Sequence, residues 1–280
     1  MRTRNVTEIR CKSILNKSKM PFSDYTLNVY QGCAFACSYC YVPAMRARRG
    51  QIDEKPWGDW VQVKLNAAEV LREQLLHIDP GAKIAIGTAT DSWQPLEKRY
   101  AIARNCLEQI AWHSNPISLL TRSPLLLRDI DVLQDISDVK IGVSLPTFDD
   151  GTRRIFEPNA PAIRGRLNLI EALVNAGFHV SLFWCPILYG VNDNKEAIHD
   201  YVRRAADLGV TRLIYDTLGY RDFLWNAHLE LLNSFQQYSP QSSPSLSNTA
   251  IADEINYWAD HYSVAVPKKD VGTLALSISV

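Results

Sequence analysis

Short apolar runs alternate along this chain with longer segments in which apolar residues recur every three or four positions. A short apolar run between polar residues is typical of a buried strand, and the longer spacing is typical of an amphipathic helix. The pattern predicts strands at 25–30, 61–65, 83–88, 117–120, 139–144, 179–185 and 211–215, with 61–65 at a sheet edge. It predicts helices at 44–49, 67–77, 96–112, 125–133, 162–176, 195–208, 223–235 and 251–257.

Strand and helix alternate about six times, which predicts an α/β fold with a parallel sheet and crossover helices. Six units indicate a partial, open (β/α)6 barrel, with its site at the carboxyl ends of the strands. Residues 1–24 are expected to form an N-terminal arm and 25–238 the partial barrel. The Ser- and Pro-rich stretch 239–248 predicts a flexible connection, so that 239–280 form a C-terminal extension.

Single residues mark where several of these elements begin and end. Asn66 is expected to cap the helix that follows it, because its side chain accepts hydrogen bonds from unpaired backbone N–H groups. Gly177 and Gly209 are expected to close two helices, and Pro186 to stop the strand before it.

Composition and charge exclude several classes of protein. Of the 280 residues 46% are hydrophobic and 21% charged, so the chain can bury a full core and is not disordered. Its 30 basic and 30 acidic residues cancel, which argues against a polycation that coats nucleic acid without sequence preference. No apolar run approaches the roughly 20 residues of a membrane span, and Met1–Met20 lacks an apolar signal core. We therefore expect a soluble, cytoplasmic protein without membrane contact, whose six cysteines stay reduced.

Three of the cysteines, Cys33, Cys37 and Cys40, lie within eight residues of one another. No fourth cysteine lies nearby and no histidine precedes His77, whereas structural zinc sites close with four ligands. Cysteine thiolates also hold iron–sulfur clusters, and three thiolates on four irons leave one iron open to a substrate or cofactor. The spacing therefore favours an iron–sulfur cluster over the alternative of a structural zinc or redox triplet.

This spacing, with an aromatic residue directly before the last cysteine, resembles that of the radical S-adenosylmethionine (SAM) enzymes. The resemblance implies a [4Fe–4S] cluster on Cys33, Cys37 and Cys40. It also implies that the amino and carboxylate groups of SAM chelate the unique iron of that cluster.

Polar side chains that follow the later barrel strands are candidates for holding a cofactor. Asp91 and Ser92 follow the second strand, where they either hold the polar end of a cofactor or cap the next helix. Arg122 follows the third strand and either pairs with a carboxylate or stays solvated at the rim. Ser144 ends the fourth strand, where a loop or cap serine is the alternative.

Two tyrosines and one further cysteine are candidates for the radical chemistry itself. Tyr39 and Tyr41 flank Cys40 and either stack on adenine, relay a hydrogen atom, or only pack the loop. Cys185 ends the fifth strand and faces the barrel if Phe183 does, because side chains alternate along a strand. Its thiol is a candidate hydrogen-atom donor, and a small buried hydrophobe is the alternative.

Charged residues near these candidates have more than one interpretation. For Glu157, an ion pair that fixes the loop is favoured over contact with substrate or ribose, and its candidate partners are Arg153, Arg154 and Arg166. A basic cluster just past the cysteine loop comprises Arg46, Arg48 and Arg49. It either contacts phosphate oxygens or is a solvated face of a short helix, and the two interpretations are weighed equally.

Four segments in this order resemble the spore photoproduct lyase-like radical enzymes, often labelled DNA repair photolyase homologues. They are Gly32-Cys33-x3-Cys37-Ser38-Tyr39-Cys40-Tyr41-Val42-Pro43, Thr90-Asp91-x3-Pro95-x-Glu97, Thr121-Arg122-Ser123-Pro124-x3-Arg128-Asp129 and Phe156-Glu157-Pro158-x-Ala160-Pro161. The resemblance spans about residues 25–220 and implies reductive cleavage of SAM to methionine and a 5′-deoxyadenosyl radical, which abstracts hydrogen from a substrate. It implies a reductant of the flavodoxin or ferredoxin type. It makes a DNA or nucleotide lesion a candidate substrate, since the lyase splits a thymine dimer in DNA.

The same resemblance places Asp91 or Ser92, Arg122 and Ser144 at the cofactor, with Arg122 in place of a lysine. It matches Tyr39 and Tyr41 with the aromatic pair around the lyase's last cysteine.

One departure concerns the cysteine that ends the lyase's second barrel strand and returns a hydrogen atom to the product radical. Residues 85–90 of this chain contain no cysteine. We therefore expect Cys185 or a tyrosine to take that role, or a different reaction. The alternatives are a radical SAM enzyme that modifies a small molecule or peptide, and a non-catalytic iron–sulfur or zinc protein.

Overall fold

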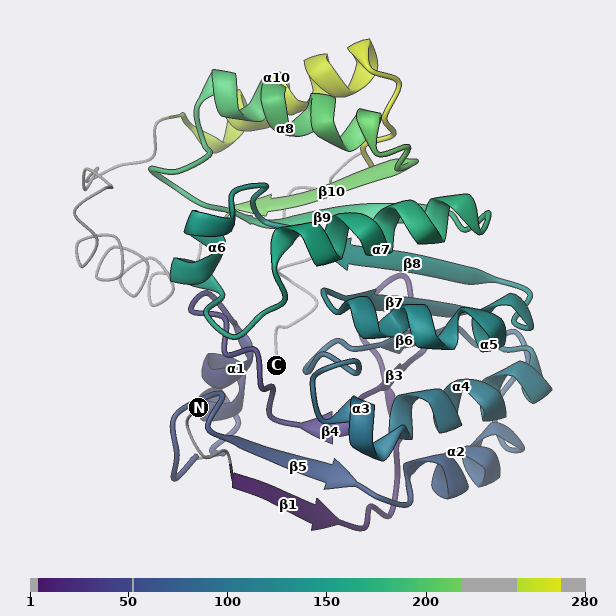
Figure 1. Cartoon of the computed structure of the whole chain (residues 1–280). Coiled ribbons are helices and arrows are strands. Elements are labelled where there is room, and N and C mark those ends of the chain that lie inside the picture. The colour runs from purple at the N-terminus through teal and green to yellow at the C-terminus, as the bar shows by residue number, and fades with distance from the viewer. Residues whose placement is uncertain (1–4, 52, 218–245, 268–280) are drawn as a thin grey trace. The chain divides into compact units, whose positions relative to one another are not determined.

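The computed structural model describes residues 5–51, 53–217 and 246–267 (Figure 1). These residues divide into two compact units. The first unit holds the described residues up to Ala36 together with Val42–Gly142, and the second holds Cys37–Tyr41 together with the described residues from Val143 onward. The helix predicted at 223–235 lies outside the described residues, and the division into arm, barrel and extension stays a prediction.

The main sheet of the first unit is built mostly of parallel strands. Its order is β8-β7-β6-β3-β2, from β8 (Val139–Ser144) through β7 (Ile117–Thr121), β6 (Ile84–Ile86) and β3 (Tyr25–Leu27) to β2 (Leu15–Lys17). β3 pairs in parallel with β6, and β6 with β7, whereas β2 is antiparallel to β3. The boundary between the two units falls inside β8. The predicted α/β class with a parallel sheet is confirmed.

A second sheet of the first unit has three strands. β5 (Trp60–Lys64) lies between β1 (Asn5–Ile9), which is parallel to it, and β4 (Tyr30–Gln31), which is antiparallel. The prediction of an edge strand at 61–65 is therefore wrong, because β1 covers the side that was expected to be open. The sequence gives no signal for β1, whose side chains are nearly all exposed and show no alternation.

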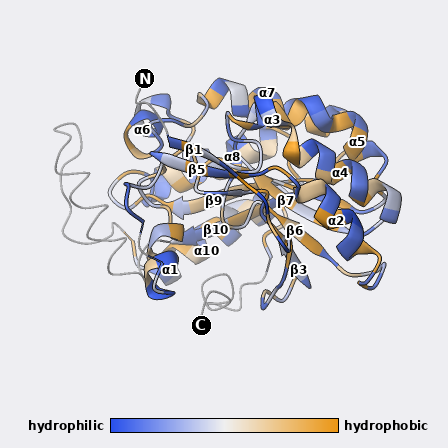
Figure 2. Cartoon of the chain, turned by 90° about the horizontal axis from the view of Figure 1, so that it is seen from below, coloured by the Kyte–Doolittle hydropathy of each residue, from blue (hydrophilic) through white to orange (hydrophobic). Residues whose placement is uncertain are grey.

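Helices α2 (Ala67–Leu75), α4 (Ile102–His113) and α5 (Ile130–Gln134) lie next to one another in the first unit (Figure 1). Each mixes hydrophobic and hydrophilic residues along its ribbon (Figure 2). The apolar positions Leu71 and Leu107 are buried, as expected for amphipathic helices that cover a sheet.

Two helices of the first unit differ from the prediction. The helix expected at 96–112 is split into α3 (Glu97–Tyr100) and α4, because Ala101 between them has a φ of 51°. The helix expected at 125–133 starts as a 3-10 helix, η1 (Pro124–Asp129), which the Ser123 side chain caps by accepting the Leu125 N–H at 3.3 Å.

Asn66 precedes α2 but does not cap it through its side chain. Its Oδ1 accepts the Cys11 N–H at 2.8 Å and its Nδ2 donates to the Cys11 carbonyl at 2.9 Å. The predicted cap is therefore wrong, because the segment after β1 uses both ends of the amide.

In the second unit the strand order is β10-β9-β8, and β9 (Val180–Ile187) is parallel to β10 (Arg212–Thr217). α8 (Lys195–Asp207) and α10 (Asn248–His261) lie side by side (Figure 1). His199 of α8 stacks on Trp258 of α10 with ring centroids 3.7 Å apart. None of the helices that the structure describes combines the length and the apolar character needed to cross a membrane.

β9 continues through Pro186 to Ile187, so the predicted stop at the proline is wrong. The Cys185–Pro186 peptide bond is cis. The pairing of β9 with β10 shifts register between Tyr215 and Thr217, so the proline, which has no N–H to donate, falls in the irregular stretch of the ladder.

The two predicted helix ends are confirmed. α7 (Ile163–Asn175) and α8 end just before Gly177 and Gly209, whose φ values are 84° and 70°. Only glycine adopts that conformation at little cost, which explains the residue at both positions.

Candidate active site

The first part of the cysteine loop is held by residues of the first unit. The Ala34 N–H donates to Gln94 Oε1 at 2.8 Å, and the Thr90 hydroxyl donates to the Gly32 carbonyl at 2.7 Å. Gln94 is fully buried, and its Nε2 donates to the Thr90 hydroxyl at 3.2 Å. These bonds fix the backbone on both sides of Cys33, and the sequence reasoning assigned no role to Gln94.

Close backbone packing shapes the same part of the loop. Gly32 has a φ of 85°, and a Cβ there would lie 2.5 Å from the Trp60 carbonyl oxygen. Ala36 has a φ of 50°, and a Cβ on Gly58 would lie 2.2 Å from the Ala36 Cβ. A larger side chain at either glycine would therefore displace the loop.

Cys33 is half-buried and lies against the turn that follows β6. The backbone N–H groups of Phe35 and Asp91 both donate hydrogen bonds to its sulfur. Burial raises the pKa of the Cys33 thiol most, the negative charge of Asp91 raises it further, and the two hydrogen bonds and the Arg122 charge oppose this. The structure thus brings Cys33, Asp91 and Arg122 together in the first unit.

The Asp91 carboxylate links the turn after β6 with the end of β7. Its Oδ1 accepts the Trp93 N–H at 2.9 Å and the Thr121 hydroxyl at 2.7 Å, and its Oδ2 accepts the Arg122 N–H at 2.9 Å. Burial raises the pKa of this carboxyl, while the hydrogen bonds and the Arg122 charge oppose the rise. Asp91 therefore stabilises its own turn, and it does not cap the next helix, because the N-cap position of α3 is Leu96 and no side chain caps it.

Ser92 is the predicted site residue whose polar group is left unused. It is fully buried, and its hydroxyl has no hydrogen-bond partner among the described residues. A buried hydroxyl without a partner is costly, so such a group in a candidate cofactor site indicates a ligand that would complete it.

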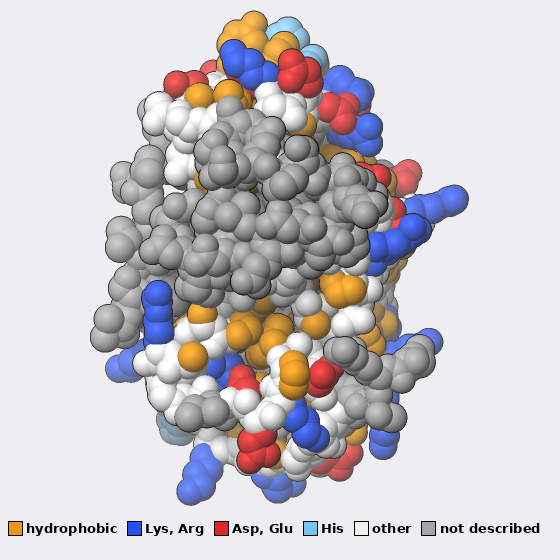
Figure 3. All heavy atoms as spheres, turned by 90° about the vertical axis from the view of Figure 1, so that its left-hand side faces the viewer, with side chains coloured by type: hydrophobic (Ala, Val, Ile, Leu, Met, Phe, Trp, Pro, Cys, Tyr) orange, Lys and Arg blue, Asp and Glu red, His pale blue; other side chains and the backbone are white. Residues whose placement is uncertain are grey.

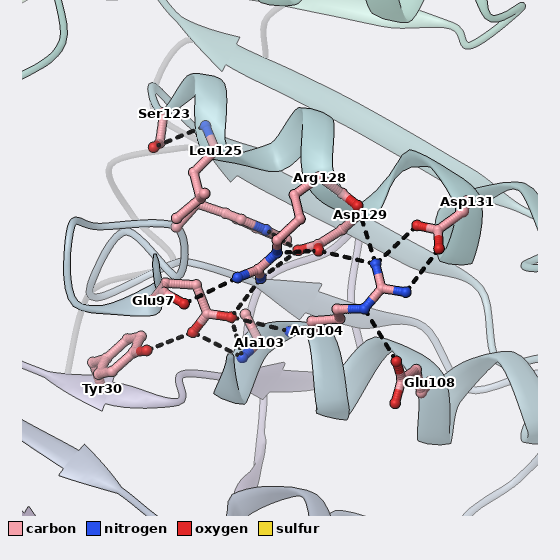
Figure 4. A network of polar contacts seen from close by, with 11 residues as sticks. Tyr30, Glu97, Ala103, Arg104, Glu108, Ser123, Leu125, Arg128, Asp129 and Asp131 are labelled. Atoms are coloured by element: carbon pink, nitrogen blue, oxygen red, sulfur yellow. Dashed lines mark hydrogen bonds and ion pairs between the residues drawn. The ribbon is translucent and has the colours of Figure 1, made fainter. Parts of the chain in front are cut away.

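A buried charge network anchors the other end of the same turn (Figure 4). Glu97 accepts the Tyr30 hydroxyl at 2.5 Å and Arg128 Nη2 at 2.9 Å. Arg128 Nε also donates to Asp129 at 2.6 Å, and Asp129 accepts the Trp93 indole N–H at 2.8 Å. Glu97, Arg128 and Asp129 belong to the segments that resemble the lyase-like family, which gave no indication of their contacts. No sequence signal indicated Tyr30 or Trp93.

The second part of the cysteine loop is held by residues of the second unit. The Ser38 N–H donates to the carbonyl of Phe156, the last residue of α6 (Asp150–Phe156), at 2.9 Å. The Cys40 N–H donates to the Cys37 carbonyl at 3.1 Å. The Tyr39 hydroxyl donates to Oε1 of Glu157.

Glu157 is buried and pairs with Arg166, so the favoured interpretation of an ion pair is confirmed. Arg166 also donates to the carbonyls of Ser144 and Pro161, each at 3.2 Å. Arg153 instead donates to the Glu157 carbonyl at 3.3 Å. The sequence reasoning missed Tyr39 as a partner of Glu157, because nothing in the spacing brings these residues together.

The remaining candidates of the second unit lie on three elements. Cys185 is half-buried on the face of β9 opposite the fully buried Trp184, as strand alternation predicts. Its Sγ donates to the Ile214 carbonyl at 3.6 Å. Ser144 is buried at the end of β8, and Tyr41 is partly exposed at the end of the cysteine loop.

One arginine of the basic cluster after the loop forms an ion pair. In α1 (Val42–Arg48), Arg46 binds Asp53 through Nε and Nη2, the latter at 2.7 Å, and lies 4.9 Å from the centre of the Trp60 ring. Arg48 and Arg49 are exposed.

All six cysteines lie in the described part of the chain and carry thiols. Among the described residues, no three histidine, cysteine, aspartate or glutamate side chains are gathered as a metal site. The donor set nevertheless fits an iron–sulfur cluster, because three thiols lie in one short loop that contains several small residues. The assignment of Cys33, Cys37 and Cys40 as ligands stays a prediction.

A profile of the Radical SAM superfamily matches residues 27–205, which is more than half of the chain. The chain belongs to this superfamily. An uncharacterised protein of Methanocaldococcus jannaschii is 27% identical over 277 residues, covering 98% of this chain and 97% of the relative. The radical SAM assignment made from the cysteine spacing is therefore confirmed.

Solved structures of other proteins share the fold. A spore photoproduct lyase with bound AdoMet and dinucleoside spore photoproduct has a TM-score of 0.68 at 12% identity, covering 93% of this chain and 80% of the lyase. Streptococcus suis SuiB bound to the precursor peptide SuiA has a TM-score of 0.54 at 10% identity, covering 96% of this chain and 50% of SuiB. At these identities the likeness concerns the fold, and it confirms the predicted radical SAM architecture.

Proposed function

We propose that this chain is a radical SAM enzyme whose [4Fe–4S] cluster is held by Cys33, Cys37 and Cys40. The observation that carries the proposal is the position of Cys33 against the Asp91 turn, beside the unpartnered buried hydroxyl of Ser92. A first cluster ligand and a polar group that awaits a partner thus lie in one part of the first unit.

The residues around Cys33 have separate roles in this proposal. Arg122 supplies a guanidinium for the SAM carboxylate, since arginine pairs with carboxylates through two parallel hydrogen bonds. Ser92 supplies a hydroxyl for a polar group of SAM, and Asp91 holds the turn that presents Ser92. In the second unit, Ser144, Tyr39 and Tyr41 are the further candidates for contact with SAM.

When bound, the cluster would supply the electron that cleaves SAM to methionine and a 5′-deoxyadenosyl radical, which abstracts a hydrogen atom from the substrate. A flavodoxin- or ferredoxin-type protein is the proposed reductant, and the proposed location is the cytoplasm. Cys185 is the proposed hydrogen-atom donor, because its half-buried thiol lies on the face of β9 opposite the buried Trp184.

The proposed substrate is a DNA or nucleotide lesion. Support comes from the four segments that resemble the lyase-like family and from the fold shared with a lyase that was solved with a dinucleoside photoproduct. On the face drawn in Figure 3, the described residues carry basic and acidic side chains interspersed. We therefore expect contacts with a local lesion to dominate over broad attraction to the phosphate backbone.

A peptide substrate is the second candidate, and the fold shared with SuiB bound to its precursor peptide favours it. The two candidates differ in how DNA binding depends on the lesion. A lesion substrate predicts that lesion-containing DNA binds more tightly than undamaged DNA of the same sequence, whereas a peptide substrate predicts no such difference. Fluorescence anisotropy with the two DNAs distinguishes the candidates.

The decisive experiment is anaerobic reconstitution with iron and sulfide, followed by incubation with SAM and dithionite. We expect 5′-deoxyadenosine and methionine in the reaction, detected by liquid chromatography. Protein that holds an intact cluster yet forms no 5′-deoxyadenosine would refute the enzyme assignment and leave a non-catalytic iron–sulfur protein. With a candidate substrate deuterated at the reacting carbon, deuterium in 5′-deoxyadenosine would identify that substrate.

A further inference from the structure

We infer that Glu157 and Arg166 are positioning residues that fix the cysteine loop by holding the hydroxyl of Tyr39. The inference rests on the proposed function, since it assumes that this loop binds the cluster. It assigns Tyr39 a role in cluster geometry in place of hydrogen-atom donation.

The Glu157–Arg166 pair is buried, and each carboxylate oxygen and each guanidinium nitrogen of the pair makes a hydrogen bond. Glu157 and Arg166 are 1% and 0% exposed. One carboxylate oxygen accepts Arg166 Nη2, and the other accepts the Tyr39 hydroxyl. The other two guanidinium nitrogens of Arg166 donate to the carbonyls of Ser144 and Pro161. Burying two charges costs solvation free energy that apolar packing of the same loop would avoid. We explain the presence of this buried pair by the carboxylate oxygen of Glu157 that accepts the Tyr39 hydroxyl.

The hydroxyl of Tyr39 has a single hydrogen, and that hydrogen is directed at the Glu157 carboxylate. Hydrogen bonds to a charged acceptor are roughly twice as strong as those between neutral groups. Transfer of the hydrogen atom to a substrate radical would break this bond and leave a buried carboxylate oxygen without its donor. Tyr39 therefore acts through the position of its ring and backbone.

The position of Tyr39 directly affects two proposed cluster ligands, Cys37 and Cys40. Tyr39 lies between Cys37 and Cys40 in the sequence, and the Cys40 N–H donates to the Cys37 carbonyl at 3.1 Å. The neighbouring Ser38 N–H donates to the Phe156 carbonyl at 2.9 Å. Two consecutive loop residues are thus attached to two consecutive residues at the end of α6, one through the backbone and one through a side chain.

The test compares Tyr39→Phe, Glu157→Gln and the double variant with the wild-type protein after anaerobic reconstitution. Tyr189→Phe is the matched control, because it removes another buried tyrosine hydroxyl, which donates to Asn248 Oδ1 at 2.7 Å. Two quantities are measured: the rate at which a chelator removes iron, and the electron paramagnetic resonance spectrum of the reduced cluster with SAM. Melting temperatures of the apoproteins report any general loss of folding.

We expect iron loss to be several-fold faster in all three variants, with a changed spectrum, and unchanged in Tyr189→Phe. The double variant should lose iron no faster than Glu157→Gln, because the contact that Tyr39→Phe removes is one that Glu157→Gln already weakens. Wild-type iron retention and spectrum in Tyr39→Phe would overturn the inference, as would additive effects in the double variant. If Glu157→Gln does not fold, the Tyr39→Phe result decides alone. If the wild-type protein takes up no cluster, the proposed function fails first and the inference with it.

Discussion

The backbone N–H of Asp91 donates a hydrogen bond to the sulfur of Cys33. The side chain of the same residue accepts the Arg122 N–H at 2.9 Å, so one turn contacts both the first cysteine and the end of β7. In parallel α/β folds, ligands bind where the carboxyl ends of neighbouring strands meet. The turn that carries Asp91 and Ser92 is therefore the part of the first unit on which the cofactor hypothesis can be tested most directly.

Ser92→Ala should separate ligand binding from stability. The Ser92 hydroxyl has no partner among the described residues, so its removal should leave apoprotein stability unchanged or raise it by up to about 1 kcal/mol. Affinity of the reconstituted protein for SAM should fall several-fold in an equilibrium binding measurement. Thr121→Val is the control, because it removes a hydroxyl that donates to Asp91 at 2.7 Å and should cost about 1 to 2 kcal/mol. Unchanged SAM affinity in Ser92→Ala would remove Ser92 from the site.

Gly58→Ala should disturb the cysteine loop. Its Cβ would lie 2.2 Å from that of Ala36, and its φ of 96° disfavours any side chain. Gly50→Ala is matched to it, since Gly50 has a φ of 69° and a Cβ there would meet no heavy atom within 4 Å, and it should cost only about 1 kcal/mol. We expect iron per chain after reconstitution to fall sharply in Gly58→Ala and to stay near the wild-type value in Gly50→Ala. Equal iron content in the two variants would argue against the packing described for this loop.

Alanine at Cys33, Cys37 or Cys40 should abolish cluster binding, because each removes one of the three proposed thiolate ligands. Cys11→Ala is the control: the described contacts of Cys11 with Asn66 use only its backbone, and iron content should stay at the wild-type level. Iron and sulfide analysis together with the visible absorption spectrum checks this. A variant at any of the three positions that retains full iron would show that the ligand assignment is wrong.

Asp149→Ala should weaken α6, the helix that leads to Glu157, by about 1 kcal/mol at pH 7. Asp149 Oδ2 accepts the Thr152 N–H at 2.6 Å, and hydrogen bonds from Thr152 hold the pKa of this carboxyl below its usual value. Because the folded pKa is lowered, the Asp149 carboxylate contributes its full stabilisation of the fold above the unfolded pKa of about 3.9. This stabilisation is lost as pH falls through the folded value. The difference from wild type should therefore shrink below about pH 4 in urea unfolding.

Asn194→Ala is the uncharged control for that pH dependence. Asn194 caps α8 by accepting the Ala197 N–H at 2.9 Å, and its amide does not titrate. The effect of Asn194→Ala should stay the same at pH 7 and pH 3. A constant effect of Asp149→Ala across this range would contradict the assigned role of its charge.

Much of the fold followed from local pattern alone. The apolar runs located β7, β8 and β9 to within a few residues, and positive-φ glycines ended α7 and α8 as expected. The predictions were wrong where a segment distant in the sequence binds the strand or the side chain concerned. The arm segment supplies β1 to cover β5, and it takes the amide of Asn66 that was expected to cap α2.

The sequence by itself determined the three closely spaced thiols and the radical SAM class, because the identity and spacing of these cysteines lie within one short loop. Only the tertiary structure decided how that loop is held. The hydrogen bonds from Ala34 to Gln94 and from Tyr39 to Glu157 join residues that lie far apart in the chain. A buried carboxylate accepts whichever donors the fold brings within about 3 Å. The linear order of residues does not specify that choice.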